Sequence, residues 1–164
     1  MKIRISMAAA ALALFVPAAS ALCAPAAQSA SANPVALKGS VQLEKTVEEA
    51  GHARTVLSEP KVVVPGDRLL FSTDYSNQGS QQVTDFIVTN PIPAAVELVA
   101  DSITAAQVSI DGGKTWGELA KLVVPDAADG KRPARASDVT HVRWVIPAIA
   151  PGGSGKVQYH AIVR

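Results

Sequence analysis

The sequence predicts an all-β protein built as an antiparallel β-sandwich, and three observations indicate this fold class. Glycine and proline, 11 of each, fall between short apolar runs, as in chains of strands joined by turns. Several runs alternate apolar and polar residues with the period of a strand that buries one face. No amphipathic helical pattern of useful length is present.

The strands are expected at near-regular spacing. In Arg68–Asn77 the apolar phase predicts that Phe71 points into the core, and in Val139–Ile146 the same reasoning places Trp144 there. The face of the first of these strands is expected to carry Leu69, Phe71, Thr73 and Tyr75. Further strands are predicted at Ser40–Val47, Ala53–Val64 with an interruption at Glu59-Pro60, Val83–Asn90, Val96–Ala100, Ala106–Asp111, Thr115–Leu119, Leu122–Val124 and Lys156–Arg164. The sequence also predicts a helical turn at Thr46–Ala50, an exposed loop at Asp126–Ser137 and a turn at Pro151–Gly155.

Three turn motifs bracket the two central strands: Pro65-Gly66-Asp67, Asn77-Gln78-Gly79-Ser80 and Asn90-Pro91-Ile92-Pro93. Proline fixes φ and glycine accepts a positive φ, so these residues favour turns. The order and spacing of the motifs resemble the bacterial conserved-repeat module called the domain of unknown function eleven family. In that family an aspartate usually stands at the place of Asn90 and a tyrosine at the place of Phe71.

The resemblance extends from Ser40 to Arg164, because Val142–Pro147 and the following Pro151-Gly152 also resemble the closing strands of the module. It implies an Ig-like antiparallel β-sandwich with Greek-key connections, in a protein exported to the bacterial cell envelope. It implies no reaction and names no ligand.

The N-terminus has the pattern of a secretory signal peptide at residues 1–21. Lys2 and Arg4 provide the positive region, and Met7–Val16 is apolar but shorter than the ~20 residues that span a bilayer. Ala19-Ser20-Ala21 is a small-x-small cleavage site, so we expect cleavage after Ala21, with Ala24 as the weaker option. The alternative is an N-terminal amphipathic or buried helix. The mature protein is expected in the periplasm or outside the cell.

Cys23 is the single cysteine, so no internal disulfide can form. Leu22 before it departs from the small residue that a lipidation signal requires, which makes a lipid anchor the minority alternative. The Ala-, Ser- and Pro-rich stretch that follows predicts a flexible linker at residues 22–38. One β-sandwich domain is expected at residues 39–164.

Charge argues against a nucleic-acid partner, and hydropathy argues against a transmembrane helix in the mature chain. The chain has 15 Lys+Arg and 14 Asp+Glu; loss of Lys2 and Arg4 leaves 13 − 14 = −1. A near-neutral mature chain lacks the basic footprint of a nucleic-acid-binding protein. After the signal peptide no apolar run approaches the length of a transmembrane helix.

The stretch Ser109–Trp116 fits the Asp-box pattern and resembles the hairpin turns of sialidases and related β-propellers. Propellers repeat such a turn in every blade, whereas this chain has one copy. We interpret Asp111, Gly112 and Gly113 as a structural turn, in which the carboxylate bonds backbone amides and glycine takes a positive φ. Trp116 is the candidate ligand contact, as a platform on which a sugar could stack.

Neither a metal nor a cofactor is expected. His52, His141 and His160 are scattered without the ligand spacing of a zinc site. Asp67, Asp74 and Asp85 lie on two strands and separate turns, unlike the close spacing of a calcium loop. Both sets are expected to be ordinary polar side chains.

The sequence offers no catalytic motif either. Gly152–Lys156 fits neither a nucleophile elbow nor a phosphate loop. Lys45 could form an isopeptide bond only with an asparagine, and Lys156–Arg164 contains none. We therefore expect a non-catalytic structural or interaction module of the envelope that binds another envelope or surface protein. The alternative is an extracellular carbohydrate-binding module that uses Trp116 and adjacent loops.

The terminal strands carry charges that bear on how a partner would bind. Ser40–Val47 contains Lys45, and the last strand contains Lys156 and Arg164. Charged side chains on edge strands oppose indiscriminate pairing. We expect both strands to be edges, so the pattern favours a partner that binds the loops over polymerisation through the edges.

Overall fold

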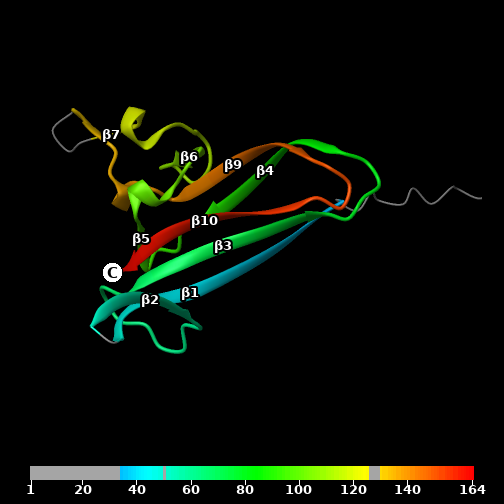
Figure 1. The fold of residues 1–164 in the computed structure, drawn as a ribbon. Coiled ribbons are helices and arrows are strands. Elements are labelled where there is room, and N and C mark those ends of the chain that lie inside the picture. Colours follow the sequence, from blue (N-terminus) through cyan, green and yellow to red (C-terminus); the bar gives the residue numbers. More distant parts are fainter. Residues whose placement is uncertain (1–33, 50, 126–129) are drawn as a thin grey trace, which may run out of the picture. The chain divides into compact units, whose positions relative to one another are not determined.

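The fold was determined from a computed structural model that describes residues 34–49, 51–125 and 130–164 (Figure 1). The predicted signal peptide, Cys23 and the predicted linker as far as residue 33 lie outside these residues. The described chain is all-β, with two antiparallel sheets packed together in a sandwich-like arrangement. The predicted fold class is confirmed at this level.

The larger sheet has five strands in the order β2-β1-β3-β10-β5. These strands are β1 (Val35–Glu49), β2 (His52–Ser58), β3 (Arg68–Asn77), β5 (Val96–Leu98) and β10 (Ser154–Val163). The smaller sheet has three strands in the order β4-β9-β6, with β4 at Val83–Pro91, β6 at Ala106–Ser109 and β9 at His141–Ile149. A two-stranded ribbon joins β7 (Val123–Pro125) to β8 (Lys131–Pro133), and short 3-10 turns occupy η1 (Ala100–Ser102), η2 (Leu119–Lys121) and η3 (Ala136–Asp138).

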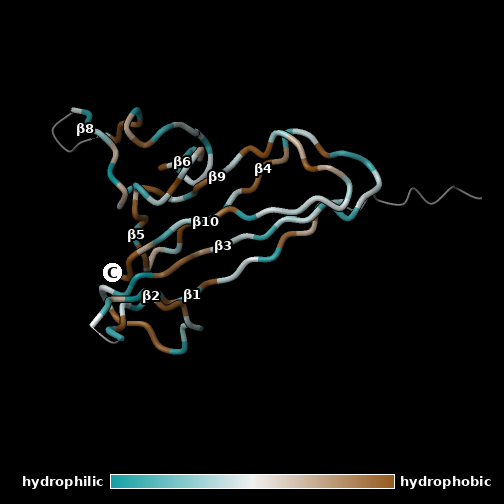
Figure 2. Tube along the Cα trace, viewed as in Figure 1, coloured by the Kyte–Doolittle hydropathy of each residue, from teal (hydrophilic) through white to brown (hydrophobic). Residues whose placement is uncertain are grey.

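The core lies between the two sheets and follows the predicted alternation. Trp144 and Val142 on β9 are buried, as expected from their phase. Leu69 and Tyr159 meet them from β3 and β10, while Phe71 is partly buried against the same cluster. Phe71 therefore faces the core as predicted but is only partly enclosed by it. Hydrophobic residues along the central strands are visible as brown segments in Figure 2.

Two connections between the sheets are joined by the side chain of Asn77. The β3–β4 and β9–β10 connections both cross from one sheet to the other. The buried Asn77 carboxamide donates to the backbone oxygens of Gln81, Ile149 and Ala150 at 2.8, 3.0 and 3.2 Å, and its oxygen accepts from the Gly79 amide. Buried carbonyls need such partners, so Asn77 fixes both connections at once.

Several boundaries differ from those predicted. β1 begins at Val35, so residues 35–38 belong to a strand although the sequence predicts a linker there. The predicted helical turn at Thr46–Ala50 is wrong, because β1 continues through Glu49 and pairs with β2. Tertiary pairing overrides the weak local preference there.

Three other segments are shorter or less regular than the patterns suggest. Instead of a strand at Thr115–Leu119, Gly117 forms one isolated bridge to Val108 and Leu119 starts a 3-10 turn. In place of the predicted exposed loop, β8 occupies residues 131–133 and η3 occupies residues 136–138; residues 126–129 lie outside the described chain. The turn predicted at Pro151–Gly155 ends earlier, because β10 begins at Ser154.

The expectation that the last strand is an edge is wrong. β10 lies between β3 and β5, and Lys156 Nζ is 3.3 Å from Asp74 Oδ1 on the neighbouring strand. Arg164 follows β10 and contacts Glu97 at 3.9 Å. Lys45 is on the half of β1 that is already paired with β2. These charges therefore protect no free edge, and the argument for a loop-binding partner loses its basis.

Candidate functional site

The most distinctive surface of the described chain is a stretch of β1 that lacks a neighbour on one side. β2 pairs with β1 only from Leu43 to Glu49, whereas β3 pairs with it from Val35 to Glu44. On the side away from β3, the segment Ala36–Gln42 has no strand partner among the described residues. We call this segment the β1 edge.

The β1 edge is left free because β2 stops early. β2 ends at Ser58, opposite Leu43, and Glu59-Pro60 follows. Proline has no backbone N–H to donate, so it ends a ladder of this kind. The chain then leaves the sheet and returns to it at Arg68.

Leu37 and Val41 give the β1 edge an apolar face. They pair in register with Tyr75 and Phe71, on the side of the sheet that packs the core. Nevertheless Leu37 is 51% exposed and Val41 36% exposed. The smaller sheet therefore leaves part of this core-facing side of β1 uncovered.

An open hollow of about 460 Å³ lies between the β1 edge and the end of β4. Gly39 and Val41 line it from β1, Tyr159 from β10, and Asn90 and Pro91 from β4. A further hollow of about 630 Å³ lies against residues 36–38 of the same strand, next to Tyr75 and Gly155. We refer to the first hollow as the β1 groove.

Stacked aromatic rings form part of the groove. The rings of Phe71 and Tyr159 are parallel within 2°, with centroids 4.8 Å apart. The Trp144 ring lies next to that of Tyr159, with the ring centroids 6.4 Å apart and an angle of 26° between the ring planes. Burial raises the pKa of the Tyr159 phenol well above its ordinary range, so the ring stays neutral. The groove therefore has an apolar, uncharged interior.

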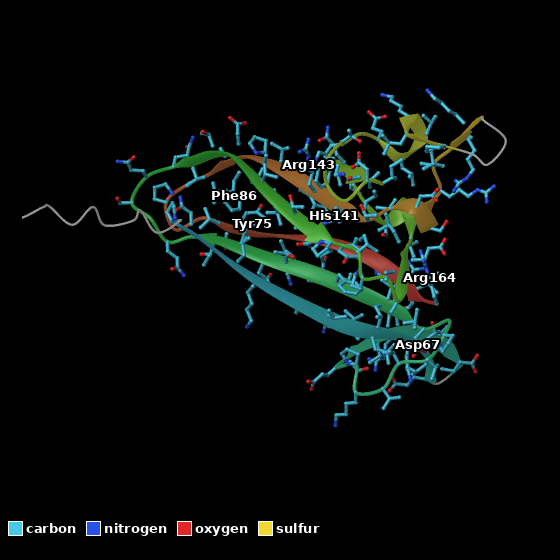
Figure 3. All side chains as sticks on the ribbon, turned by 180° about the vertical axis from the view of Figure 1, so that it is seen from behind. Asp67, Tyr75, Phe86, His141, Arg143 and Arg164 are labelled. Atoms are coloured by element: carbon cyan, nitrogen blue, oxygen red, sulfur yellow. The ribbon has the colours of Figure 1, made fainter. Side chains whose placement is uncertain are left out.

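A polar contact joins the two sheets at the groove. Asn90 Nδ2 donates to Thr73 Oγ1 at 2.8 Å and joins β4 to β3. In Figure 3 the side chains of Tyr75 and Phe86 lie between the two sheets, towards the β3–β4 connection. Both are partly buried against the core, which supports the sheets beyond the groove.

Tyr75 also explains a glycine in β10. A Cβ placed on Gly155 would collide with the phenol of Tyr75, so the ring lies directly over the glycine. By contrast, a Cβ on Gly39 of the β1 edge would meet no atom within 4 Å. The first glycine is required by packing, and the second leaves an open place on the edge.

The predicted Asp-box turn is present with a dense set of hydrogen bonds. Asp111 accepts from the amides of Lys114 and Thr115 at 3.0 and 2.9 Å, and from the Thr115 hydroxyl at 2.6 Å. The bonds from Thr115 are the main reason that the pKa of Asp111 lies well below its usual range. Gly112 and Gly113 have φ of 77° and 87°, as a turn of this type requires.

Trp116 is half-buried on the outer side of the smaller sheet. Its Nε1 donates to the Gly113 oxygen at 3.0 Å, and the Arg143 guanidinium carbon lies 4.4 Å from the ring centroid. Arg143 is itself held by two bonds to Gln107 Oε1 at 2.9 and 2.8 Å, and Figure 3 shows it on the same side as His141. An ordered cation therefore occupies one face of the ring that a sugar would use.

The histidines do not come together, and no metal-binding group of His, Cys, Asp and Glu occurs within the described ranges. His52 is exposed in β2, and His141 packs edge-on to Trp116 with centroids 6.3 Å apart. His160 Nε2 lies 3.0 Å from Glu44 Oε2, which Arg68 also approaches at 3.3 Å. The Glu44 carboxylate thus links β1 to both β3 and β10, and none of the three histidines contacts another.

The three aspartates considered for calcium are likewise dispersed. Asp67 Oδ2 accepts from the Val64 amide at 2.9 Å and stabilises the turn before β3. Asp74 pairs with Lys156 across β3 and β10. Asp85 lies on β4 with φ of 51°. Each has its own local surroundings, so they do not form a common site.

Comparison of the chain with protein-family models, curated proteins and solved structures found no match. In the part of the chain that the structure describes, no helix is long and apolar enough to cross a membrane. The β1 edge and the β1 groove are the features of the described chain that bear on its function.

The sequence does not point directly to this site. Its residues are spread over β1, β3, β4 and β10. Asn90 and Pro91 belong to a turn motif, and none of the lining residues belongs to a catalytic or ligand-binding motif. One signal was available: the alternation that Val41 follows inside the predicted strand continues backwards past Ser40 to Gly39 and Leu37. Extending that alternation backwards would identify the strand, but not its free side.

Proposed function

We propose that the chain is a non-catalytic, exported interaction module of the bacterial cell envelope, and that its β1 edge binds an extended segment of another envelope or surface protein chain. The observation that carries the proposal is the free β1 edge beside an apolar groove. An extended peptide satisfies both features, because its backbone can continue the ladder while alternate side chains enter the groove.

The proposed Ig-like fold with Greek-key connections fits the path of the chain. The connections β3–β4, β4–β5, β5–β6 and β9–β10 each pass from one sheet to the other. Crossings of this kind are typical of Ig-like sandwiches. The resemblance of the turn motifs to the conserved-repeat envelope module supports the same fold and compartment. Intact mass of the exported protein tests this, with an N-terminus at Leu22 expected and retention of residues 1–21 contradicting export.

A binding role fits the lining of the groove better than catalysis does. Among the residues that line the β1 groove there is no histidine, cysteine or acid. The hydroxyls of Ser72 and Thr73 accept bonds from Gln158 and Asn90, so neither is placed beside a general base. What the groove offers is apolar surface next to an unpaired backbone.

The alternative is carbohydrate binding through Trp116. Because Arg143 covers one face of the ring and is fixed by Gln107, less of the ring is free for a sugar than in an open platform. A glycan array tests this alternative. Binding that is lost in Trp116→Ala and retained in Leu37→Lys would favour it over the proposal.

Site-specific photo-crosslinking tests the proposal. A photoreactive amino acid replaces Leu37 on the β1 edge, and in the control it replaces Ile87, which is 50% exposed on β4. Crosslinking in cells is expected to give a discrete protein adduct from position 37 and none from position 87. Equal patterns from both positions, or no adduct at all, would contradict the proposal.

A further inference from the structure

The β1 edge differs from the other strand edges in how little protects it. Natural edges are blunted by charges, proline, short length or local distortion. β4 carries Asp85 at a positive φ and ends at Pro91, and β6 covers only Ala106–Ser109. The β1 edge has one charged residue, Lys38, together with two exposed aliphatic side chains. It is therefore suited to pair with another strand.

The surroundings restrict the strand that can pair there. At one end the ladder is blocked, because Leu43 already pairs with Ser58 of β2. The incoming strand must therefore be short, extended and free along its own edge. It must also place aliphatic side chains beside Leu37 and Val41. Within the described chain, the β1 edge itself meets these requirements.

We propose that the β1 edge pairs with the β1 edge of a second copy of this protein, antiparallel about a two-fold axis at Gly39. This inference rests on the proposed function, because it names the chain that occupies the edge. In the pair, Gly39 lies opposite Gly39, and Leu37 lies opposite Val41 of the second copy. Two five-stranded sheets then join into one continuous sheet.

The register follows from the side chains and from symmetry. Residues directly opposite in an antiparallel pair point to the same face of the sheet. Centring the pair on Gly39 keeps Leu37 and Val41 together on the core-facing side. Centring it on Lys38 would place two ammonium groups side by side, which is unfavourable.

The length of the pair agrees with the same register. With Gly39 at the centre, Ala36 lies opposite Gln42 of the second copy, so pairing covers the β1 edge. It stops at Leu43 in both copies, where β2 begins to pair. At the axis neither Gly39 carries a side chain, which favours the close approach of two backbones.

A cysteine at the axis tests this pairing directly. Directly opposite Cα atoms in an antiparallel pair are about 4.5–5.5 Å apart, within the range that a disulfide can bridge. Gly39→Cys, combined with Cys23→Ser, is expected to form a disulfide-linked dimer under mild oxidation. Ser40→Cys in the same background is the matched control, because Ser40 lies opposite Lys38 and not opposite itself. An equal yield from both variants, or no dimer from Gly39→Cys, would overturn the register.

Sedimentation velocity over a range of concentrations tests the association without a crosslink. The wild-type protein is expected to dimerise reversibly. Leu37→Lys with Val41→Lys, and separately Leu37→Glu with Val41→Glu, should each weaken self-association by about tenfold or more, because both symmetric cross-strand pairs become like-charged. An equal mixture of the two variants should recover dimers, since each Lys then lies opposite a Glu. Ile87→Lys is the control and should dimerise as the wild type does.

The outcomes separate this inference from the proposed function. A wild-type protein that is monomeric at every concentration overturns the second copy as partner. If position 37 nevertheless crosslinks to a different envelope protein in cells, the proposed function stands; if it crosslinks to nothing, both fail. Far-UV circular dichroism checks that each charged variant is folded, and the Gly39→Cys result decides the matter should one of them unfold.

Discussion

The carboxamide of Asn77 donates a hydrogen bond to the backbone carbonyl of Ile149, at a distance of 3.0 Å and 72 residues apart in the sequence. This contact joins the end of β3 to the end of β9. Because the same side chain also bonds Gln81 and Ala150, one residue holds both crossings between the sheets. Asn77 is therefore a structural residue, even though its sequence context suggested only a turn.

Asn77→Ala is expected to lower the free energy of unfolding by about 3 kcal/mol or more, because buried carbonyls that lose their partners cost about 1–3 kcal/mol each. Urea unfolding measures the change. Gln78→Ala is the matched control, since its side chain is exposed on the same connection and should leave stability within about 0.5 kcal/mol. If Asn77→Ala lost as little stability as Gln78→Ala, water would have to satisfy the carbonyls that Asn77 bonds in the wild type.

Trp144→Ala and Phe71→Ala should differ in size. Trp144 is buried, and truncating a buried aromatic side chain costs about 3–5 kcal/mol. Phe71 is only partly buried and stacks on Tyr159, so its truncation removes less buried surface and should cost less stability. Denaturant midpoints of the two variants provide the measurement. A larger loss of stability in Phe71→Ala than in Trp144→Ala would contradict the description of Trp144 as the more deeply buried of the two.

Gly155→Ala should destabilise the protein by about 1–3 kcal/mol, the usual range for overpacking, because the added methyl displaces the Tyr75 ring. In Tyr75→Ala the same glycine substitution should cost much less, since the obstacle is gone. Gly39→Ala is the control, because its Cβ meets open space. Thermal unfolding at low protein concentration measures the stability of Gly155→Ala, Tyr75→Ala, the double variant and Gly39→Ala. Additive effects of the Gly155 and Tyr75 substitutions would contradict the contact between these two residues.

Asp138 should contribute to the dependence of stability on pH. The bidentate contact with Arg132 at 2.7 Å, followed by the Arg135 amide, lowers its pKa from 3.8 to about 2. A group whose pKa is lower in the folded state stabilises the fold above its unfolded pKa, and this contribution disappears as pH falls through the folded value. Asp138→Asn should therefore be less stable than the wild type at pH 7.

The difference between wild type and Asp138→Asn should narrow as the pH falls from about 4 to about 2. Acid titration of stability in both proteins measures it. Asp101→Asn, which removes an exposed carboxylate in η1, is the control and should show no comparable narrowing. A difference that stays constant across this range would rule out the ionic contact as its source.

Local alternation predicts much of this fold. The bounds of Arg68–Asn77 and the start of Val83–Pro91 agree with the sequence, and the phase of Trp144 is confirmed. In these strands one face is buried along most of the length, so apolar and polar residues alternate in the sequence. The all-β class follows from the same signal.

Strand order and the free edge could not be predicted in this way. The position of β10 between β3 and β5 depends on pairing between distant segments, and nothing in Lys156–Val163 distinguishes a central strand from an edge. The β1 edge depends on where β2 ends and on how far the smaller sheet reaches. Both are properties of the assembled sheets, which is why Leu37 and Val41 look like ordinary strand residues in the sequence.

Amide hydrogen exchange along β1, recorded at low and high protein concentration, measures the pairing of the β1 edge without any substitution. Outward-facing amides within Ala36–Gln42 are expected to exchange quickly in dilute solution and more slowly as the protein concentration rises. Amides of Lys45–Glu49, already on the half paired with β2, should not change. Exchange within Ala36–Gln42 that is equally fast at every concentration would contradict the claim that this edge accepts a strand from a second copy.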